Sequence, residues 1–174
     1  MTSLSSPGPA AAAPTVPSRL RRFACMMYEG VLLFGVVFLA DYLLDTLTQS
    51  RHALMLRHTR QAWLFLAIGA YFVLCWRGNG QTLPMKTWHI RLQERDGRTP
   101  RLMRLAARYA LAWPLPLAGA AAVWAVSTAT GWPSANMLIV AAPFLHFAWS
   151  WFDPDGQFLH DRLLGTRLVD TRPA

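Results

Sequence analysis

The sequence contains few of the residues that build disulfide frameworks, metal centres or hydrolytic sites. It has only two cysteines, Cys25 and Cys75, which lie within or beside apolar stretches and form no CxxC pair. We interpret both as buried thiols that pack as small hydrophobic side chains. The five histidines show no HExxH spacing, and no GxSxG sequence is present. We therefore expect no metal, no cofactor and no enzymatic nucleophile.

Acidic residues are scarce and lysine is almost absent. Nine acidic residues stand against seventeen basic ones, which gives a net charge of +8, and sixteen of the seventeen are arginine. A basic chain can bind nucleic acid. Here, however, the arginines lie between apolar segments instead of forming one basic domain, and no RNA- or DNA-binding motif is present. We predict no nucleic-acid partner and expect anionic lipid headgroups to be the acidic surface.

The N-terminal segment lacks the basic region and apolar region of a cleaved signal peptide. Its sequence, MTSLSSPGPAAAAPTVPS, is rich in proline, alanine and serine, so we predict a disordered tail over residues 1–18. The length of the chain allows one domain. We place that domain at residues 19–170, followed by a short C-terminal tail at residues 171–174.

Long apolar runs occupy most of the remaining chain. The apolar fraction of 53% exceeds the soluble average of about 45–50%. Crossing the hydrocarbon of a bilayer takes roughly 20 apolar residues in a helix. Four runs approach or reach this length: Met26–Leu47, Ala62–Trp76, Leu105–Thr128 and Ser134–Phe152. The second can extend upstream past Arg57 and Arg60, and Pro114 and Pro116 should kink the third. We predict an all-α membrane protein with four transmembrane helices.

Lysine and arginine are divided unequally between the two sides of this topology. Fourteen lie in the N-terminal flank, the segment 77–108 and the C-terminal tail. Three lie on the opposite side, namely Arg51, Arg57 and Arg60. Because cytoplasmic loops carry the excess of positive residues, we predict a multi-pass membrane protein with both termini in the cytoplasm.

A thirteen-residue phrase occurs twice, as GQTLPMKTWHIRL from Gly80 and as GQFLHDRLLGTRL from Gly156. The shared positions pair Gly80 with Gly156, Gln81 with Gln157, Leu83 with Leu159, Arg91 with Arg167 and Leu92 with Leu168. Each phrase follows two apolar runs, so both phrases return to the cytoplasmic side. We predict two parallel two-helix repeats related by an axis along the membrane normal. Chance similarity is the alternative.

Each phrase predicts a helix end followed by a cytoplasmic amphipathic segment. Its glycine can supply the left-handed cap that ends a transmembrane helix. A short amphipathic helix can follow, with Pro84 near the first turn, where proline is tolerated.

Strand-like patterns follow the amphipathic segments. Trp88–Glu94 approaches alternation, Asp96 and Gly97 form a hairpin signal, and Arg98–Arg101 would return. Gly165–Asp170, which includes Thr166, has a similar pattern. We hypothesise that these segments pair as a small β-ribbon that links the two repeats. The alternative is an interfacial helix followed by an unstructured loop.

Three carboxylates fall within the first apolar run: Glu29, Asp41 and Asp45. Charged groups in hydrocarbon are costly, so such residues usually face the interior of the helix bundle or water. Asp41 and Asp45 lie near the outer end of the run, where loop arginines can neutralise them. The arginines available there are Arg51, Arg57 and Arg60.

Glu29 lies deeper, about one turn inside the cytoplasmic end and seven residues after Arg22, so the two share one stripe of the helix. Two interpretations stay open for Glu29: a structural ion pair, or a group that handles protons or ions. We expect Arg108, one turn inside the third run, to reach lipid phosphate or Glu29. His146 in the fourth run is interpreted as a packing histidine.

The densest polar cluster is His160-Asp161-Arg162 in the second phrase. An enzyme would use His160 as a base and Asp161 as the acid that orients it. Neighbouring side chains on a helix point about 100° apart, so we predict no such dyad and no catalysis. We expect Asp161 to accept bonds from backbone donors or from an arginine of the other repeat, such as Arg22 or Arg91.

At these residues the chain resembles the RDD family of small integral membrane proteins, named for one arginine and two aspartates. GQTLPMKTWHIRLQERDG and HDRLLGTRLVD are similar to the family's GQTxGK and HDRxxGT patterns, and the resemblance runs from residue 19 to residue 170. Arg22 matches the family's arginine, Glu29 stands at its first aspartate position, and Asp161 fits the second. Pro84 replaces the usual glycine after GQTL.

The resemblance implies transport, because some family members are described as cation/proton antiporters and transport of unspecified ligands has been supposed. Our first hypothesis is a transport-related protein of a bacterial inner membrane that exchanges cations for protons, in which Glu29 and Asp161 handle charge and Arg22 is their counter-ion. Four helices are few to enclose a pathway, so this hypothesis expects a homo-oligomer. Our second hypothesis is a non-transporting accessory or assembly protein. Its basic cytoplasmic face would dock a membrane-protein partner or anionic lipid through Arg91, Arg95, Arg98 and Arg101.

Overall fold

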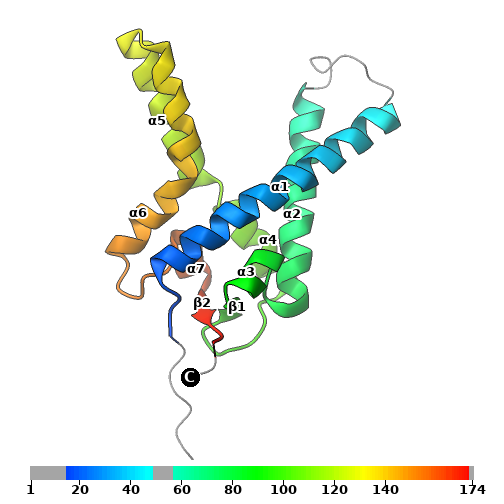
Figure 1. Ribbon diagram of the computed structural model, residues 1–174, viewed down its shortest axis with the longest axis vertical. Coiled ribbons are helices and arrows are strands. Elements are labelled where there is room, and N and C mark those ends of the chain that lie inside the picture. Colours follow the sequence, from blue (N-terminus) through cyan, green and yellow to red (C-terminus); the bar gives the residue numbers. More distant parts are fainter. Residues whose placement is uncertain (1–14, 49–56, 173–174) are drawn as a thin grey trace, which may run out of the picture.

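The computed structural model describes residues 15–48 and 57–172. Two helical arms diverge from a common base (Figure 1). One arm contains α1 (Arg19–Thr48) and α2 (Arg57–Asn79), and the other contains α5 (Pro114–Thr130), η1 (Pro133–Phe144) and α6 (Leu145–Phe152). The base holds the short elements, which are α3 (Leu83–Thr87), β1 (Ile90–Glu94), α4 (Leu102–Leu111), α7 (Leu159–Leu164) and β2 (Thr166–Asp170).

The predicted membrane spans are present as helices. Four helical stretches are long and apolar enough to cross a membrane: Arg19–Thr48, Arg57–Thr87, Leu102–Thr130 and Pro133–Phe152. Large apolar side chains stand outward along the arms, as for Val31 at 73% exposure and Val140 at 79%. Exposing such an apolar surface to water would cost free energy, whereas contact with lipid tails, which are equally apolar, would not. The chain is therefore a multi-pass membrane protein.

Two spans depart from the continuous α-helices that the sequence predicted. The third does not kink at its prolines but breaks: α4 ends at Leu111, and α5 begins at Pro114. Proline lacks the N–H that would continue the hydrogen-bond ladder, and its ring clashes with the carbonyl one turn back. The fourth span is a 3₁₀ helix over its first twelve residues, with Pro143 inside it, and becomes α-helical only at Leu145.

The base contains the two-stranded ribbon that the sequence predicted between the two Gly-Gln phrases. β1 and β2 pair antiparallel, with Leu92 opposite Leu168. The expected return strand at Arg98–Arg101 is wrong. After the turn, the Glu94 N–H donates to the Arg98 carbonyl at 2.8 Å, and the chain then leaves for α4. The buried Pro100 has no N–H to extend such a ladder.

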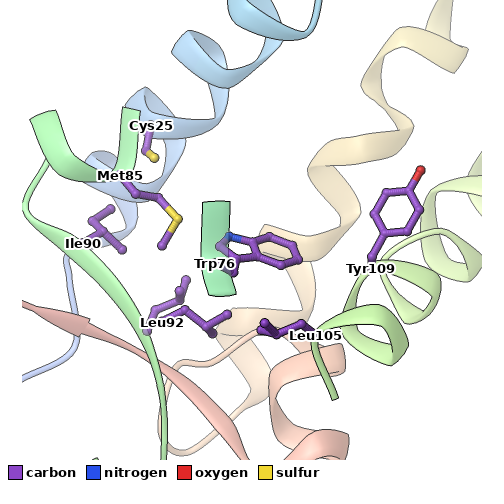
Figure 2. Packing of buried hydrophobic residues seen from close by; sticks show 8 residues of the cluster. Cys25, Trp76, Met85, Ile90, Leu92, Leu105 and Tyr109 are labelled. Atoms are coloured by element: carbon purple, nitrogen blue, oxygen red, sulfur yellow. The ribbon is translucent and has the colours of Figure 1, made fainter. Parts of the chain in front are cut away.

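The apolar core lies in the base, where α1, α2, α3, α4 and both strands meet (Figure 2). Its buried members are Cys25, Trp76, Met85, Ile90, Leu92, Leu105, Tyr109 and Leu168. Ile90, Leu92 and Leu105 are exposed by no more than 1%. Cys25 is buried and Cys75 half-buried, and both are free thiols. The base is thus the closely packed part of the protein, from which the arms project.

Residues near both ends of the chain join the ribbon. The Asp170 N–H donates to the Thr15 carbonyl at 2.8 Å, and Pro17 is buried. Arg21, at the start of α1, forms an ion pair with Asp170 and donates to the Trp88 carbonyl. Residues 1–14 of the predicted disordered tail, and residues 173–174 of the C-terminal tail, lie outside the described residues.

Candidate functional site

A buried ion pair joins α4 to α7. The Arg108 Nε donates to Asp161 Oδ1 at 2.7 Å, and its Nη2 donates to Oδ2 at 2.9 Å. The Thr166 hydroxyl also donates to Oδ1 at 2.7 Å. The Arg108 guanidinium lies 4.4 Å from the centre of the Trp76 ring. Two parallel charge-assisted bonds plus a hydroxyl leave Asp161 fully satisfied.

These contacts correct three sequence predictions. Asp161 is held by Arg108, not by Arg22 or Arg91. Arg108 in turn does not contact Glu29, and its guanidinium is engaged by both oxygens of Asp161 instead of by lipid phosphate. The helix break between α4 and α5 lets α4 pack against α7, and the sequence does not show the angle that such a break produces.

The charge of Asp161 is fixed by its surroundings. Burial by itself would raise the pKa of this carboxyl, but the charge of Arg108, the proximity of His160 and the hydrogen bonds from Arg108 and Thr166 outweigh it. Together they lower the pKa of Asp161 to about 2. Asp161 therefore stays ionised at any physiological pH, so it acts as a structural anion.

His160 lies against this pair in a neutral state. Its Nε2 lies 3.5 Å from Asp161 Oδ2, a closer approach than the helix spacing alone suggested. The 100° between adjacent residues fixes only where the side chains start, and these two converge within the buried base. Burial lowers the pKa of His160 to about 3, with Arg108 adding to the effect and Asp161 opposing it.

We expect the free energy of unfolding to fall as the pH drops below neutral, because the folded protein holds His160 in its uncharged form. Its pKa is about 6.5 in the unfolded chain and about 3 when folded, so between these values the unfolded state binds the extra proton. The contribution of neutral His160 to the free energy of unfolding is complete above pH 6.5. Below that pH it declines by about 1.4 kcal/mol per pH unit.

Thermal unfolding in detergent at pH 7.5 and pH 5.5 measures this effect. His160→Gln should flatten the difference between the two pH values. The exposed His89 provides the control, since His89→Gln should leave the difference as it is in the wild type. Equal pH dependence in the wild type and His160→Gln would contradict the assignment.

Glu29 has a different environment from Asp161. Its Oε1 accepts a hydrogen bond from the Tyr71 hydroxyl at 2.6 Å, and its Oε2 accepts one from the Thr82 hydroxyl at 2.6 Å. Glu29 is 8% exposed, and within the described part of the chain no basic group lies within ion-pair distance of it. The structural ion pair considered for Glu29, including Arg22 as its counter-ion, is not formed.

Arg22 faces the second phrase instead. Its Nη1 donates to the Gly156 carbonyl at 2.7 Å, and its guanidinium lies 4.8 Å from the centre of the Phe158 ring. Arg22 is only 3% exposed. The predicted polar cluster thus divides into separate parts: Arg22 on Gly156, Glu29 on two hydroxyls, and Asp161 on Arg108.

Arg162 is not part of the buried cluster. Its Nη1 lies 2.9 Å from Asp155 and 3.4 Å from Asp153, and its side chain is 41% exposed. The outer carboxylates of the first span are also separate. Of the arginines expected to neutralise Asp41 and Asp45, Arg60 contacts both of them, while Arg51 lies outside the described residues.

The repeated Gly-Gln phrase has the same local role at both sites. Each glycine has a positive φ, 69° at Gly80 and 61° at Gly156. Gln81 Nε2 donates to the Ile90 carbonyl at 2.7 Å. The Gln157 side chain bonds both the N–H and the carbonyl of Leu168, at 2.9 and 3.3 Å. Each phrase therefore turns the chain and attaches it to the strand that follows. Gly165 similarly caps α7 with φ 67°.

A cavity of about 350 Å³ lies between the two arms, above the base. Its wall is mostly apolar, with residues from α1, α2, α4, η1 and α6. The charged and polar residues that line it include Arg22, Glu29, Arg108, His146 and His160. His146 Nε2 lies 3.0 Å from the Ala112 carbonyl, in keeping with a packing role. In the described ranges, no three His, Cys, Asp or Glu residues gather as metal ligands.

Sequence reasoning missed Tyr71 and Thr82, the two hydroxyls on Glu29. A lone tyrosine in an apolar run carries no spacing signal. Thr82 is the third residue of the GQT pattern, and it also accepts a bond from the Met85 N–H at the start of α3, so the motif itself could have indicated it.

The comparisons with known proteins agree with this architecture. The RDD family pattern matches residues 16–165, which include both arms, the first phrase, most of the second phrase and the buried Arg108–Asp161 pair. Neither the curated proteins nor the solved structures yielded a match. Because the match covers most of the 174 residues, this chain belongs to the RDD family.

Proposed function

We propose that this protein exchanges monovalent cations for protons across a bacterial inner membrane, with both termini in the cytoplasm and Glu29 as the exchanging group. The observation that carries the proposal is a cavity-lining carboxylate with no basic partner among the described residues. A carboxylate at membrane depth is costly unless it is paired or functional.

The hydroxyls around Glu29 suit either protonation state. Tyr71 and Thr82 donate to the ionised carboxylate, and a hydroxyl can also accept a bond from the protonated acid. The same three side chains place oxygen atoms together, and oxygen is the ligand that hard cations prefer. A proton and a cation would therefore compete for one group, which is the simplest basis for exchange.

Asp161 is left out of this mechanism. Its bidentate bonds to Arg108 and its lowered pKa make proton release and uptake at neutral pH unfavourable. We propose that a homo-oligomer completes the pathway, because four spans are few to enclose one and both arms have exposed apolar faces.

Proteoliposomes that enclose a pH-sensitive dye test the exchange. An imposed Na⁺ or K⁺ gradient should drive proton movement with the wild type, and Glu29→Gln should slow it at least about tenfold. The only other glutamate, Glu94, provides the matched control. It forms an ion pair with Arg104 in the base, and Glu94→Gln should retain flux. A folded wild type that moves no protons under either gradient would refute the proposal.

A second candidate function is supported by the basic face of the base. Arg91, Arg95, Arg98 and Arg101 are all exposed on or just after β1. Such a cluster favours docking of an acidic surface on a membrane-protein partner. This corresponds to an accessory or assembly role without transport.

Crosslinking in cells followed by purification tests the docking role. The wild type should retain a crosslinked partner that the triple variant Arg95→Gln, Arg98→Gln, Arg101→Gln loses, because the arginines supply the attraction. Arg57, exposed at the far end of α2, provides the control, and Arg57→Gln should keep the partner. A partner retained equally by the triple variant would exclude this face.

A further inference from the structure

Arg22 is a buried cation without a counter-ion in the described part of the chain. A guanidinium carries five N–H donors, yet among the described residues Arg22 makes one side-chain hydrogen bond, from Nη1 to the Gly156 carbonyl. Within the same residues its Nε has no partner, and no carboxylate lies within ion-pair distance. Burying a charge without an opposite charge is strongly unfavourable, and the Phe158 ring offsets only part of that cost.

The other charged groups that line the cavity do not neutralise Arg22. Asp161 is engaged by Arg108, so that pair contributes no net charge. Glu29 lies two helical turns along α1 and is bonded by hydroxyls. His160 is neutral at physiological pH because burial lowers its pKa. The end of the cavity at Arg22 therefore has a positive charge, which favours binding of an anion.

The rest of the cavity wall is suited to an apolar part of a ligand. Its wall includes Leu33, Ile68, Phe72, Trp113 and Phe147. The volume of about 350 Å³ lies within the 300–1,000 Å³ typical of small-molecule sites. The two arms diverge from the base (Figure 1), and the residues that line the cavity come from both of them. Because both arms have exposed apolar faces that suit lipid, an occupant can enter sideways from the bilayer.

The depth of Arg22 matches a lipid headgroup. Arg22 is the fourth residue of α1, so it lies only about 4–5 Å along the helix axis from the first residue. Basic residues at this depth reach the phosphate layer of a bilayer. The cavity then continues along α1 past Met26 and Glu29 to Leu33, in the direction that an acyl chain takes.

We propose that this cavity binds one anionic phospholipid, with its phosphate on Arg22 and an acyl chain along the apolar wall between the arms. This lipid shares the cavity with Glu29, but its phosphate lies at Arg22, two helical turns away, and the lipid proposal does not depend on the exchange.

A phosphatidylglycerol with a photoactivatable acyl chain is the probe. The full-length protein is placed in nanodiscs of phosphatidylcholine containing this probe, and the labelled residues are mapped. Labelling should saturate at cavity residues such as Phe72 and Phe147. Unlabelled phosphatidylglycerol should compete, whereas added phosphatidylcholine and inorganic phosphate should not. Competition by phosphate alone, or equally by phosphatidylcholine, would overturn the proposal.

Three variants sharpen the test. Arg22→Gln should reduce cavity labelling at least tenfold, although the loss of its bond to Gly156 can also disturb the fold. Leu33→Trp fills the cavity without touching the charge and should have the same effect. Val31→Trp, on the exposed face of the same helix, is the matched control and should label as the wild type. Equal labelling of Leu33→Trp and Val31→Trp would refute the site.

Glu29→Gln separates the two proposals. It should retain cavity labelling even where it abolishes proton flux, because the phosphate lies at Arg22. Lost flux with retained labelling supports both proposals. Flux in the wild type without cavity labelling would refute the lipid site alone.

Discussion

Replacing Asp161 with asparagine should lower the free energy of unfolding by about 3–5 kcal/mol, which is the usual cost of removing one partner from a buried ion pair. Asp161 is fully buried and accepts three hydrogen bonds, two from Arg108 and one from Thr166. The amide of asparagine carries no charge, so Arg108 would remain buried and uncompensated beneath α7.

Thermal or SDS-induced unfolding of the purified protein measures this loss. Asp155→Asn is the control, because Asp155 also pairs with an arginine, Arg162, but is 61% exposed. Exposed pairs contribute about 0–1 kcal/mol, so this variant should resemble the wild type. The double variant Asp161→Asn, Arg108→Met should be less destabilised than the sum of the single changes. Equal effects of Asp161→Asn and Asp155→Asn would contradict the assigned role.

The Arg108–Asp161 ion pair stabilises the base at the point where elements next to both arms meet. In the chain, α4 precedes the second arm and α7 follows it. The ion pair between Arg108 and Asp161 connects these two helices, and the Arg108 guanidinium also stacks on Trp76 of the first arm. Arg21 and Arg22 tie the start of α1 to β2 and to the second phrase. The arms can therefore diverge around a cavity because arginines fix their ends in one base.

The spans and the ribbon could be predicted because their signals are local. A run of apolar residues such as Met26–Leu47 has the length of a bilayer whatever surrounds it. The alternation near Ile90–Glu94 and Thr166–Asp170 indicates strands, and the matched phrases indicated that the two would meet. The return strand at Arg98–Arg101 was wrong because a local hairpin signal cannot show that the chain turns away into α4.

The pairing of the charges could not be predicted because it depends on angles between elements. Arg108 lies close to the break between α4 and α5, and the direction of α4 decides whether it reaches Glu29 or Asp161. Tyr71 and Thr82 were missed for a related reason. They meet Glu29 from α2 and from the turn before α3; Tyr71 carries no pattern of its own, and the GQT pattern marks Thr82 without showing that it faces Glu29.

Gly80→Ala should be the most damaging single-methyl change in the phrases. Gly80 has φ 69°, and a Cβ there would lie 2.5 Å from the Leu92 backbone carbonyl oxygen. The left-handed conformation costs a non-glycine residue roughly 1–2 kcal/mol. The contact with a backbone atom adds strain, because that carbonyl belongs to a strand and cannot rotate away. We expect a total loss of at least about 3 kcal/mol in the free energy of unfolding.

Gly156→Ala is the matched control, since it changes the same position of the other phrase. Gly156 has φ 61°, but a Cβ there would meet no heavy atom within 4 Å. Gly156→Ala should therefore show only the conformational cost. In thermal unfolding, Gly80→Ala should be clearly less stable than Gly156→Ala. Amide exchange at Leu92, whose N–H donates to the Gly80 carbonyl at 2.8 Å, should accelerate only in Gly80→Ala. Equal losses in the two variants would mean that the left-handed turn alone requires glycine, and that the close approach of α2 to β1 adds nothing to it.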